Sequence, residues 1–137
     1  MAITTPTTRK RASIYSDFYK DFTQNVVNED IARRTDEEAV KEAIRNLVLT
    51  DKFERPFQPD LGCNIRKMLF ENIMPETLEL TKQIIQDTLN AYEPRANILS
   101  VDATSAIDDN TINIRIVFNV INIIEPITLE FTLTKVR

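Results

Sequence analysis

A proline at position 94 divides the chain into two parts whose residue patterns differ. Up to Tyr92, apolar residues recur at the three- and four-residue spacing of a helix, and from Leu99 onward they alternate with polar residues as in a strand. Proline offers no amide hydrogen to a helix and disfavours the helical conformation in the residue before it. The sequence therefore predicts that a helix ends at this corner, that a sheet follows, and that Glu93 and Arg95 sit on a stiff bend. Their charges either pair with neighbours in the same molecule or have a functional role.

Three main helices are predicted before the corner. Thr35 and Glu38 have the spacing of a capping box, so the first helix is expected to begin there and to end near residues 49–50. Its core-facing stripe consists of Val40, Ile44, Leu47 and Val48. A short second helix is expected over residues 65–73. Pro75, a favourable first helical residue, then opens the longest helix, which runs to the corner.

Three antiparallel strands are predicted after the corner. Apolar and polar residues alternate over residues 99–103, 111–122 and 127–133, and a turn is expected at residues 108–110. A short connection that contains Pro126 joins the last two strands into a C-terminal hairpin. Helices followed by such strands predict an α+β fold, with the helices packed on one face of a three-stranded antiparallel sheet.

The length of 137 residues fits one domain. We expect residues 14–137 to form it and residues 1–13, which carry Arg9-Lys10-Arg11, to be a flexible arm. The aromatic residues between positions 15 and 22 fit either one helical face or an extended segment. The first residues lack the apolar segment of a signal peptide, and no apolar run has the roughly 18 to 20 residues of a membrane span. We therefore expect a protein that stays in the cytoplasm where it is made and has no membrane partner.

Residue types that usually carry catalysis are missing or rare in this sequence. The chain has no histidine, a single glycine, Gly62, and a single cysteine, Cys63. We therefore expect no histidine-based catalytic site, no metal site and no bound nucleotide or other cofactor. The net charge of -4, without a long basic stripe, argues against nucleic acid as a main partner.

A carboxylate-based hydrolase is the catalytic alternative that stays open. Glu54, Glu71 and Glu93 are its candidate residues, two of which would have to lie about 5 to 9.5 Å apart with one of them protonated. Arg55 and Arg95 lie close to two of these residues in the sequence, and a neighbouring guanidinium favours the ionised form of a carboxylate. That effect opposes the role of a general acid, so we expect no catalytic residue.

A loop over residues 51–60 contains two prolines and two phenylalanines, Phe53 and Phe57. It is too apolar for a flexible linker, and its rings are expected to tether it to the body of the protein. Gly62 admits a turn after it.

The edges of the predicted sheet are weakly protected against pairing with another chain. Between residues 111 and 134 the charged residues are Arg115, Glu125 and Glu130 alone. Either the N-terminal segment of the same chain covers the exposed parts, or a partner adds a strand whose backbone completes the ladder.

Several short motifs follow one another along the chain: Asn46-Leu47-Val48-Leu49-Thr50, Glu54-Arg55-Pro56-Phe57, Pro59, Gly62, Leu69-Phe70-Glu71 and Glu93-Pro94-Arg95. Together they resemble the baseplate wedge, or sheath-initiator, family of contractile-tailed phages, which includes a baseplate subunit of type VI secretion systems. The resemblance runs from about Tyr15 to the C-terminus. It implies a structural protein of the virion tail, made in the host cytoplasm, although the family is also called lysozyme-like and a peptidoglycan hydrolase is the alternative.

The resemblance also implies partners. Glu93, Pro94 and Arg95 are expected to dock onto the helical core bundle of the wedge proteins, and arms of the tail sheath protein are expected to add strands to the sheet and so start sheath assembly. Neighbouring inner baseplate and tube-initiator proteins are further expected partners. A structural role is expected for the motif of Glu54, Arg55, Pro56 and Gly62. Because both corner charges are expected at the surface, replacing Glu93 and Arg95 by alanine is expected to leave the fold stable.

Overall fold

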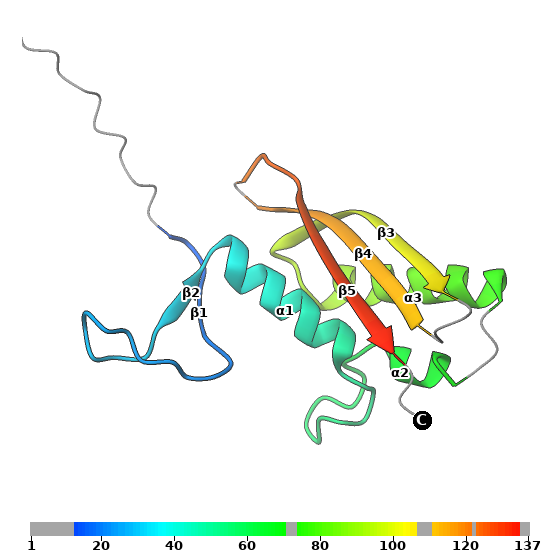
Figure 1. Cartoon of the computed structure of the whole chain (residues 1–137), viewed down its shortest axis with the longest axis horizontal. Helices are drawn as coiled ribbons and strands as arrows, with labels where there is room; N and C mark the ends of the chain where they lie inside the picture. The colour runs from blue at the N-terminus through cyan, green and yellow to red at the C-terminus, as the bar shows by residue number, and fades with distance from the viewer. Residues whose placement is uncertain (1–12, 71–73, 107–110, 122, 135–137) are drawn as a thin grey trace, which may run out of the picture. The chain divides into compact units, whose positions relative to one another are not determined.

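The computed structural model describes residues 13–70, 74–106, 111–121 and 123–134, in which the elements follow one another as β1-β2-α1-α2-α3-β3-β4-β5 (Figure 1). The chain divides into two compact units, one up to Ala39 and one from Val40 onward. The prediction that residues 14–137 form a single domain stays a prediction. The predicted arm over residues 1–13 lies outside the described residues except for Ser13.

The first unit contains a β-hairpin. β1 (Ser16–Phe18) pairs antiparallel with β2 (Arg33–Thr35), and the amide of Asp36 donates to the carbonyl of Tyr15 at 2.8 Å. The aromatic segment is therefore extended here, which decides between the two interpretations of its spacing. Thr35 pairs with Ser16 in this hairpin and does not cap the first helix, which begins at Glu37.

Three helices are described in the chain. α1 (Glu37–Leu49) ends where the apolar stripe predicted, and its residues from Val40 onward belong to the second unit. α2 (Ile65–Met68) is shorter than predicted, and the end predicted for it lies partly outside the described residues. α3 (Pro75–Tyr92) has the predicted bounds, with proline as its first residue. In the described part of the chain, no helix is both long and apolar enough to cross a membrane.

The sheet of the second unit has the strand order β3-β4-β5. β3 (Ala96–Ala106) pairs antiparallel with β4 (Thr111–Val120), which pairs antiparallel with β5 (Ile127–Thr134). The predicted α+β fold with a C-terminal hairpin is confirmed. The turn predicted at residues 108–110 lies outside the described residues.

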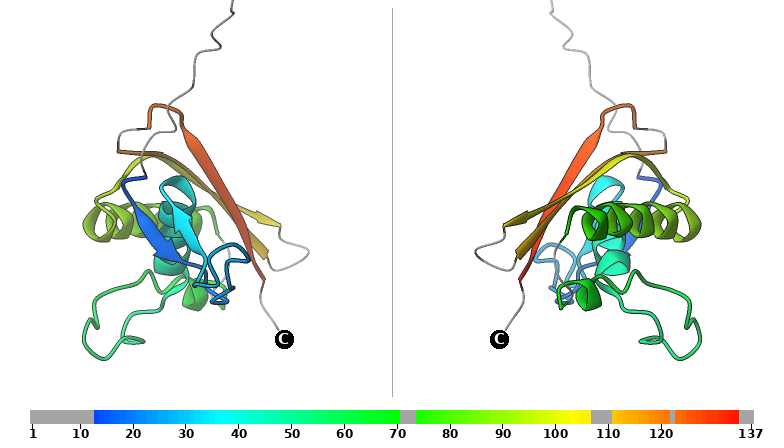
Figure 2. Two further views of the ribbon diagram at one scale, coloured as in Figure 1. Left: turned by 90° about the vertical axis from the view of Figure 1, so that its left-hand side faces the viewer. Right: turned by 90° about the vertical axis from the view of Figure 1, so that its right-hand side faces the viewer.

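The two faces of this sheet differ as the alternation of residues requires. One face carries a buried apolar layer made of Ile98, Val101, Ala103, Ile112, Ile114, Ile116, Phe118, Val120 and Ile127. The helices α1 and α3 lie on this face, as the side views show (Figure 2). The apolar stripe of α1 is buried. The core of the second unit is therefore the layer between helices and sheet. The opposite face of the sheet is mostly polar and exposed, but Val117 and Asn119 on it are half-buried.

Candidate functional site

The corner between α3 and β3 is held by backbone hydrogen bonds on both sides of Pro94. The amide of Glu93 donates to the carbonyl of Leu89 at 2.9 Å, which is the last turn of the helix. The amide of Ala96 donates to the carbonyl of Glu93 at 3.2 Å, and the amide of Ile121 donates to the carbonyl of Arg95 at 3.0 Å. The corner is thus hydrogen-bonded to the end of β4, and the bend lies at Pro94, where the sequence predicted it.

Within this corner, Glu93 and Arg95 bind each other. The Arg95 Nε donates to Glu93 Oε1 at 2.6 Å and its Nη2 donates to Oε2 at 2.7 Å, so the guanidinium and the carboxylate meet at two points. Glu93 is only 5% exposed, whereas the Arg95 side chain keeps 31% of its surface exposed. The expectation that both charges lie at the surface is therefore wrong for Glu93. Its carboxylate orients Arg95, and Arg95 carries the charge of the corner that a partner can reach.

The motif loop after α1 depends on Gly62. This residue has φ +125°, and a Cβ atom built on it would lie 2.4 Å from the carbonyl oxygen of Thr50, which accepts the amide of Cys63. Any side chain at this position would collide with backbone. Glu54 also stabilises the loop, because its Oε2 accepts a hydrogen bond from the amide of Asp51 at 3.0 Å.

Arg55 and Pro56 are exposed in this loop, and so are both phenylalanines of residues 51–60. The prediction that Phe53 and Phe57 tether the loop to the body is therefore wrong. The loop is held by backbone hydrogen bonds, and the rings point to solvent.

The outer strands of the sheet differ in how completely their apolar side chains are covered. On β3 the inward residues Ile98, Val101 and Ala103 are buried, the strand packs against α3, and a bulge at Leu99 interrupts its register. On β5, Ile127 is buried but the following inward residues are only half-buried: Leu129, Phe131 and Leu133. Among the described strands, β4 alone pairs with β5, so one of its edges carries no partner strand there. Sequence alternation predicted these residues as inward-facing but contained no signal for their incomplete coverage.

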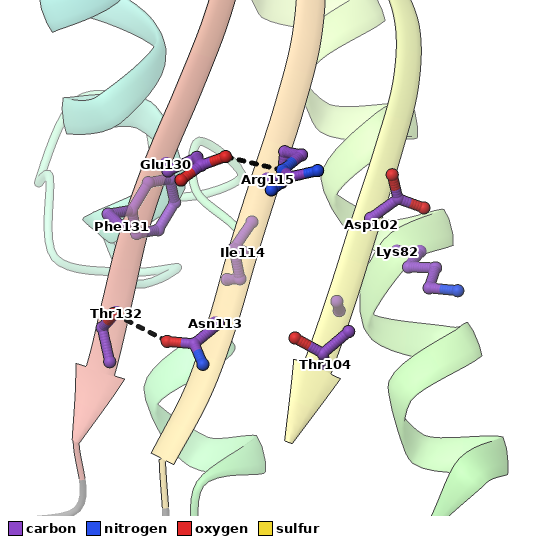
Figure 3. A pocket seen from close by; sticks show the side chains of 10 residues that line it. Lys82, Asp102, Thr104, Asn113, Ile114, Arg115, Glu130, Phe131 and Thr132 are labelled. Atoms are coloured by element: carbon purple, nitrogen blue, oxygen red, sulfur yellow. Dashed lines mark hydrogen bonds and ion pairs between the residues drawn. The ribbon is translucent and has the colours of Figure 1, made fainter. Parts of the chain in front are cut away.

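A cavity of about 460 Å³ is lined by residues of all three strands of the sheet and by Lys82 of α3 (Figure 3). Two rows of exposed side chains flank it, one with Asp102, Arg115 and Glu130 and the other with Thr104, Asn113 and Thr132. Arg115 Nε donates to Glu130 Oε1 at 2.6 Å, and Thr132 Oγ1 donates to Asn113 Oδ1 at 2.7 Å. These two contacts pair polar side chains of β4 with polar side chains of β5.

Of the three carboxylates considered for hydrolysis, the structure describes Glu54 and Glu93. Glu93 is bound at both oxygens by Arg95, and Glu54 is exposed and accepts a backbone amide. Glu71 lies outside the described residues. The described part of the chain also contains no group of three or more carboxylate or cysteine side chains placed to hold a metal ion.

Residues 34–122 match the sequence profile of the family described as baseplate wedge protein gp25. A curated relative, the baseplate wedge protein gp25 of Enterobacteria phage T4, is 32% identical over 109 residues. The matched region covers 80% of this chain and 82% of that relative.

Solved structures of several other proteins have the same fold. A crystal structure of a Geobacter sulfurreducens protein, provisionally named a tail lysozyme, has a TM-score of 0.66 and 29% identity, and the match covers 74% of this chain and 92% of that one. A chain in the baseplate of the anti-feeding prophage has a TM-score of 0.61 and 18% identity, covering 88% and 85% of the two chains. A chain in the baseplate complex of the type VI secretion system has a TM-score of 0.62 and 17% identity, covering 71% and 91%. The last two likenesses show a shared fold alone.

Proposed function

This chain belongs to the baseplate wedge protein gp25 family of contractile tails, and we propose that it has no chemistry of its own and acts by joining two kinds of partner in the phage tail baseplate. Arg95, oriented by Glu93, docks on the helical core bundle of the wedge proteins. The open edge of β5 receives a strand from the tail sheath protein and so starts sheath assembly. Synthesis in the host cytoplasm and contacts with neighbouring inner baseplate and tube-initiator proteins are part of the same proposal.

The observation that carries the strand-addition step is the half-buried row of Leu129, Phe131 and Leu133 on β5. An added strand would supply backbone partners for the free edge of β5 and would extend the apolar layer over this row. β3 is the poorer acceptor because its inward residues are already buried and its bulge disturbs the spacing that a regular ladder needs. The acceptor edge is therefore β5.

The arriving strand must also match the chemistry of β5. Apolar residues at every second position would face the helices, and polar residues would continue the exposed face that Thr128, Glu130 and Thr132 form. A basic residue beside Glu130 would be favoured, since opposite charges on neighbouring strands attract. The partner segment is thus an alternating strand with at least one cation on its polar face.

An inward charge on β5 tests this step. Leu133→Lys places an ammonium group where the arriving strand must pack, a device by which natural edge strands prevent pairing. We expect the variant to fold and to bind the wedge proteins, but to nucleate purified sheath protein at least tenfold more slowly than the wild type. Thr128→Lys, which adds the same charge on the exposed face, serves as the matched control. Equal nucleation by Leu133→Lys and the wild type would contradict the assignment of β5.

A peptidoglycan hydrolase is the second candidate, because the 29% identical Geobacter protein carries the provisional name tail lysozyme. The bound state of Glu93 and the exposure of Glu54 oppose it. We expect no release of soluble fragments from purified cell walls. Release that disappears in Glu54→Gln or Glu71→Gln would establish hydrolysis and overturn the structural role.

A further inference from the structure

The loop between α1 and α2 presents two phenylalanine rings to solvent. Phe53 is 76% exposed and Phe57 is 98% exposed. Burial of such a side chain stabilises a protein by about 1.5 to 3 kcal/mol, so two exposed rings on one short loop forgo a large gain. The loop nevertheless holds them away from the core.

Several hydrogen bonds hold the loop in this shape. The amide of Phe53 donates to the carbonyl of Pro59 at 2.8 Å, which closes the loop across its base. The amide of Lys52 donates to Asn64 Oδ1 at 2.8 Å. The end of the loop packs closely on Thr50, because a side chain at Gly62 would collide with the Thr50 carbonyl. The rings are therefore displayed by an ordered backbone and lose little entropy when they bind.

Phe53 also has a strained backbone. Its φ of +69° lies in the left-handed region, which a bulky residue occupies at a cost of about 1 to 2 kcal/mol. An asparagine or glycine at this position would adopt the left-handed conformation with less strain. Neither the folding of the loop nor its solubility explains a phenylalanine here, whereas contact with a partner does.

The loop lies beside the docking corner. The hydroxyl of Tyr92 donates to the carbonyl of Asp60 at 3.4 Å, and Tyr92 is both half-exposed and the neighbour of Glu93. We propose that Phe53 and Phe57 bind the same wedge protein that Arg95 binds, on the apolar stripe of a helix that carries a carboxylate for Arg95 near one end. This inference rests on the proposed docking role of the corner and adds the apolar part of that interface.

Other occupants fit this surface less well. The charged residues around the rings are of both signs, three acidic and two basic: Asp51, Glu54, Asp60, Lys52 and Arg55. Such a mixed rim gives an anionic membrane or a nucleic acid no net attraction. An apolar centre with a mixed polar rim is the usual composition of a protein interface.

The test measures binding of the full chain to the purified complex of wedge proteins encoded with it, co-expressed and immobilised for interferometry. Phe57→Ser and Phe53→Asn should each weaken binding about tenfold or more, the loss typical of an aromatic residue at the centre of an interface. Phe53→Asn should at the same time leave the melting temperature unchanged or raise it, because asparagine tolerates the left-handed backbone. Val26→Ser, which alters a residue of equal exposure in the first unit, is the matched control.

Arg95→Lys, which keeps the charge but not the two-point pairing, separates the two proposals. If this variant binds weakly while both phenylalanine variants bind normally, the proposed role of the loop is overturned and the docking role of Arg95 stands. If the phenylalanine variants bind weakly while Arg95→Lys and Arg95→Met bind normally, the loop binds a partner but the docking role of Arg95 is overturned. Equal losses in Val26→Ser, or a concentration-dependent dimer that Phe57→Ser abolishes, would also overturn the proposed role of the loop.

Discussion

The Glu93 carboxylate and the Arg95 guanidinium form a two-point ion pair across Pro94, with nitrogen-to-oxygen distances of 2.6 and 2.7 Å. The carboxylate is nearly buried and the guanidinium is partly exposed. Glu93 holds the planar group of Arg95 at two points, so under the proposed docking role Glu93 would act through Arg95.

Replacing Arg95 by alanine should destabilise the protein, in contrast to the surface positions that the sequence predicted for this pair. The change leaves the nearly buried Glu93 carboxylate without its two hydrogen bonds, and an unsatisfied buried polar group costs about 1 to 3 kcal/mol. The free energy of unfolding in urea, measured by circular dichroism, checks this value. Glu93→Gln combined with Arg95→Ala should cost less than the sum of the two single changes, because the residues are coupled.

Arg115→Ala is the control for that measurement. Arg115 and Glu130 also pair at 2.6 Å, but both side chains are more than half exposed, at 60% and 59%. Exposed pairs contribute about 0 to 1 kcal/mol. Equal losses of stability in Arg115→Ala and Arg95→Ala would show that burial of Glu93 has no energetic consequence.

Gly62→Ala should be among the most destabilising small substitutions in the chain. The new methyl group would meet the Thr50 carbonyl at 2.4 Å in a backbone conformation that L side chains rarely adopt. We expect a loss of more than about 2 kcal/mol in the free energy of unfolding, or insoluble protein, because incompatible glycine replacements exceed the usual cost of about 1 kcal/mol. Asp60→Ala, in the same loop, should change stability by less than about 0.5 kcal/mol.

The single thiol should make stability fall at alkaline pH. Burial raises the pKa of Cys63 above its ordinary value of 9.0, although hydrogen bonding with Thr88 and the charge of Lys52 act in the other direction. The unfolded thiol ionises near pH 9 while the folded thiol stays neutral, so its stabilising contribution is present below pH 9 and is lost as pH rises towards the native pKa. The free energy of unfolding should therefore decline more steeply from pH 9 to pH 10.5 in the wild type than in Cys63→Ala.

Reaction of Cys63 with a thiol reagent gives an independent check, because the side chain is almost fully buried. Labelling should be slow in the native protein and rapid in urea. Rapid native labelling, together with identical pH profiles of the wild type and Cys63→Ala, would contradict the buried position.

Local rules predicted the elements whose boundaries a single residue determines. Pro75 and Pro94 mark the two ends of α3, and strict alternation identified β4 and β5 with little error. The capping pattern at Thr35 failed because pairing with Ser16 places that residue in a strand, a tertiary contact that spacing cannot reveal.

The candidate site was predicted less completely than the fold. The motif located the corner, but the burial of Glu93 depends on a contact with Arg95 and on the end of β4, neither of which appears in a linear pattern. The phenylalanines of the loop were expected to pack on the body because apolar residues usually lie inside, whereas both rings are exposed. The loop backbone is held by the hydrogen bonds from Phe53 to Pro59 and from Cys63 to Thr50.

The most direct test of the proposed function is amide hydrogen exchange in β5, followed in the free chain and in the chain bound to purified sheath protein. In the free chain, the β5 amides that point away from β4 should exchange quickly, and sheath binding should slow them by at least a hundredfold while the exchange of β3 changes little. Amides of β5 that are already fully protected in the free chain, or protection that appears on β3 instead, would contradict the account.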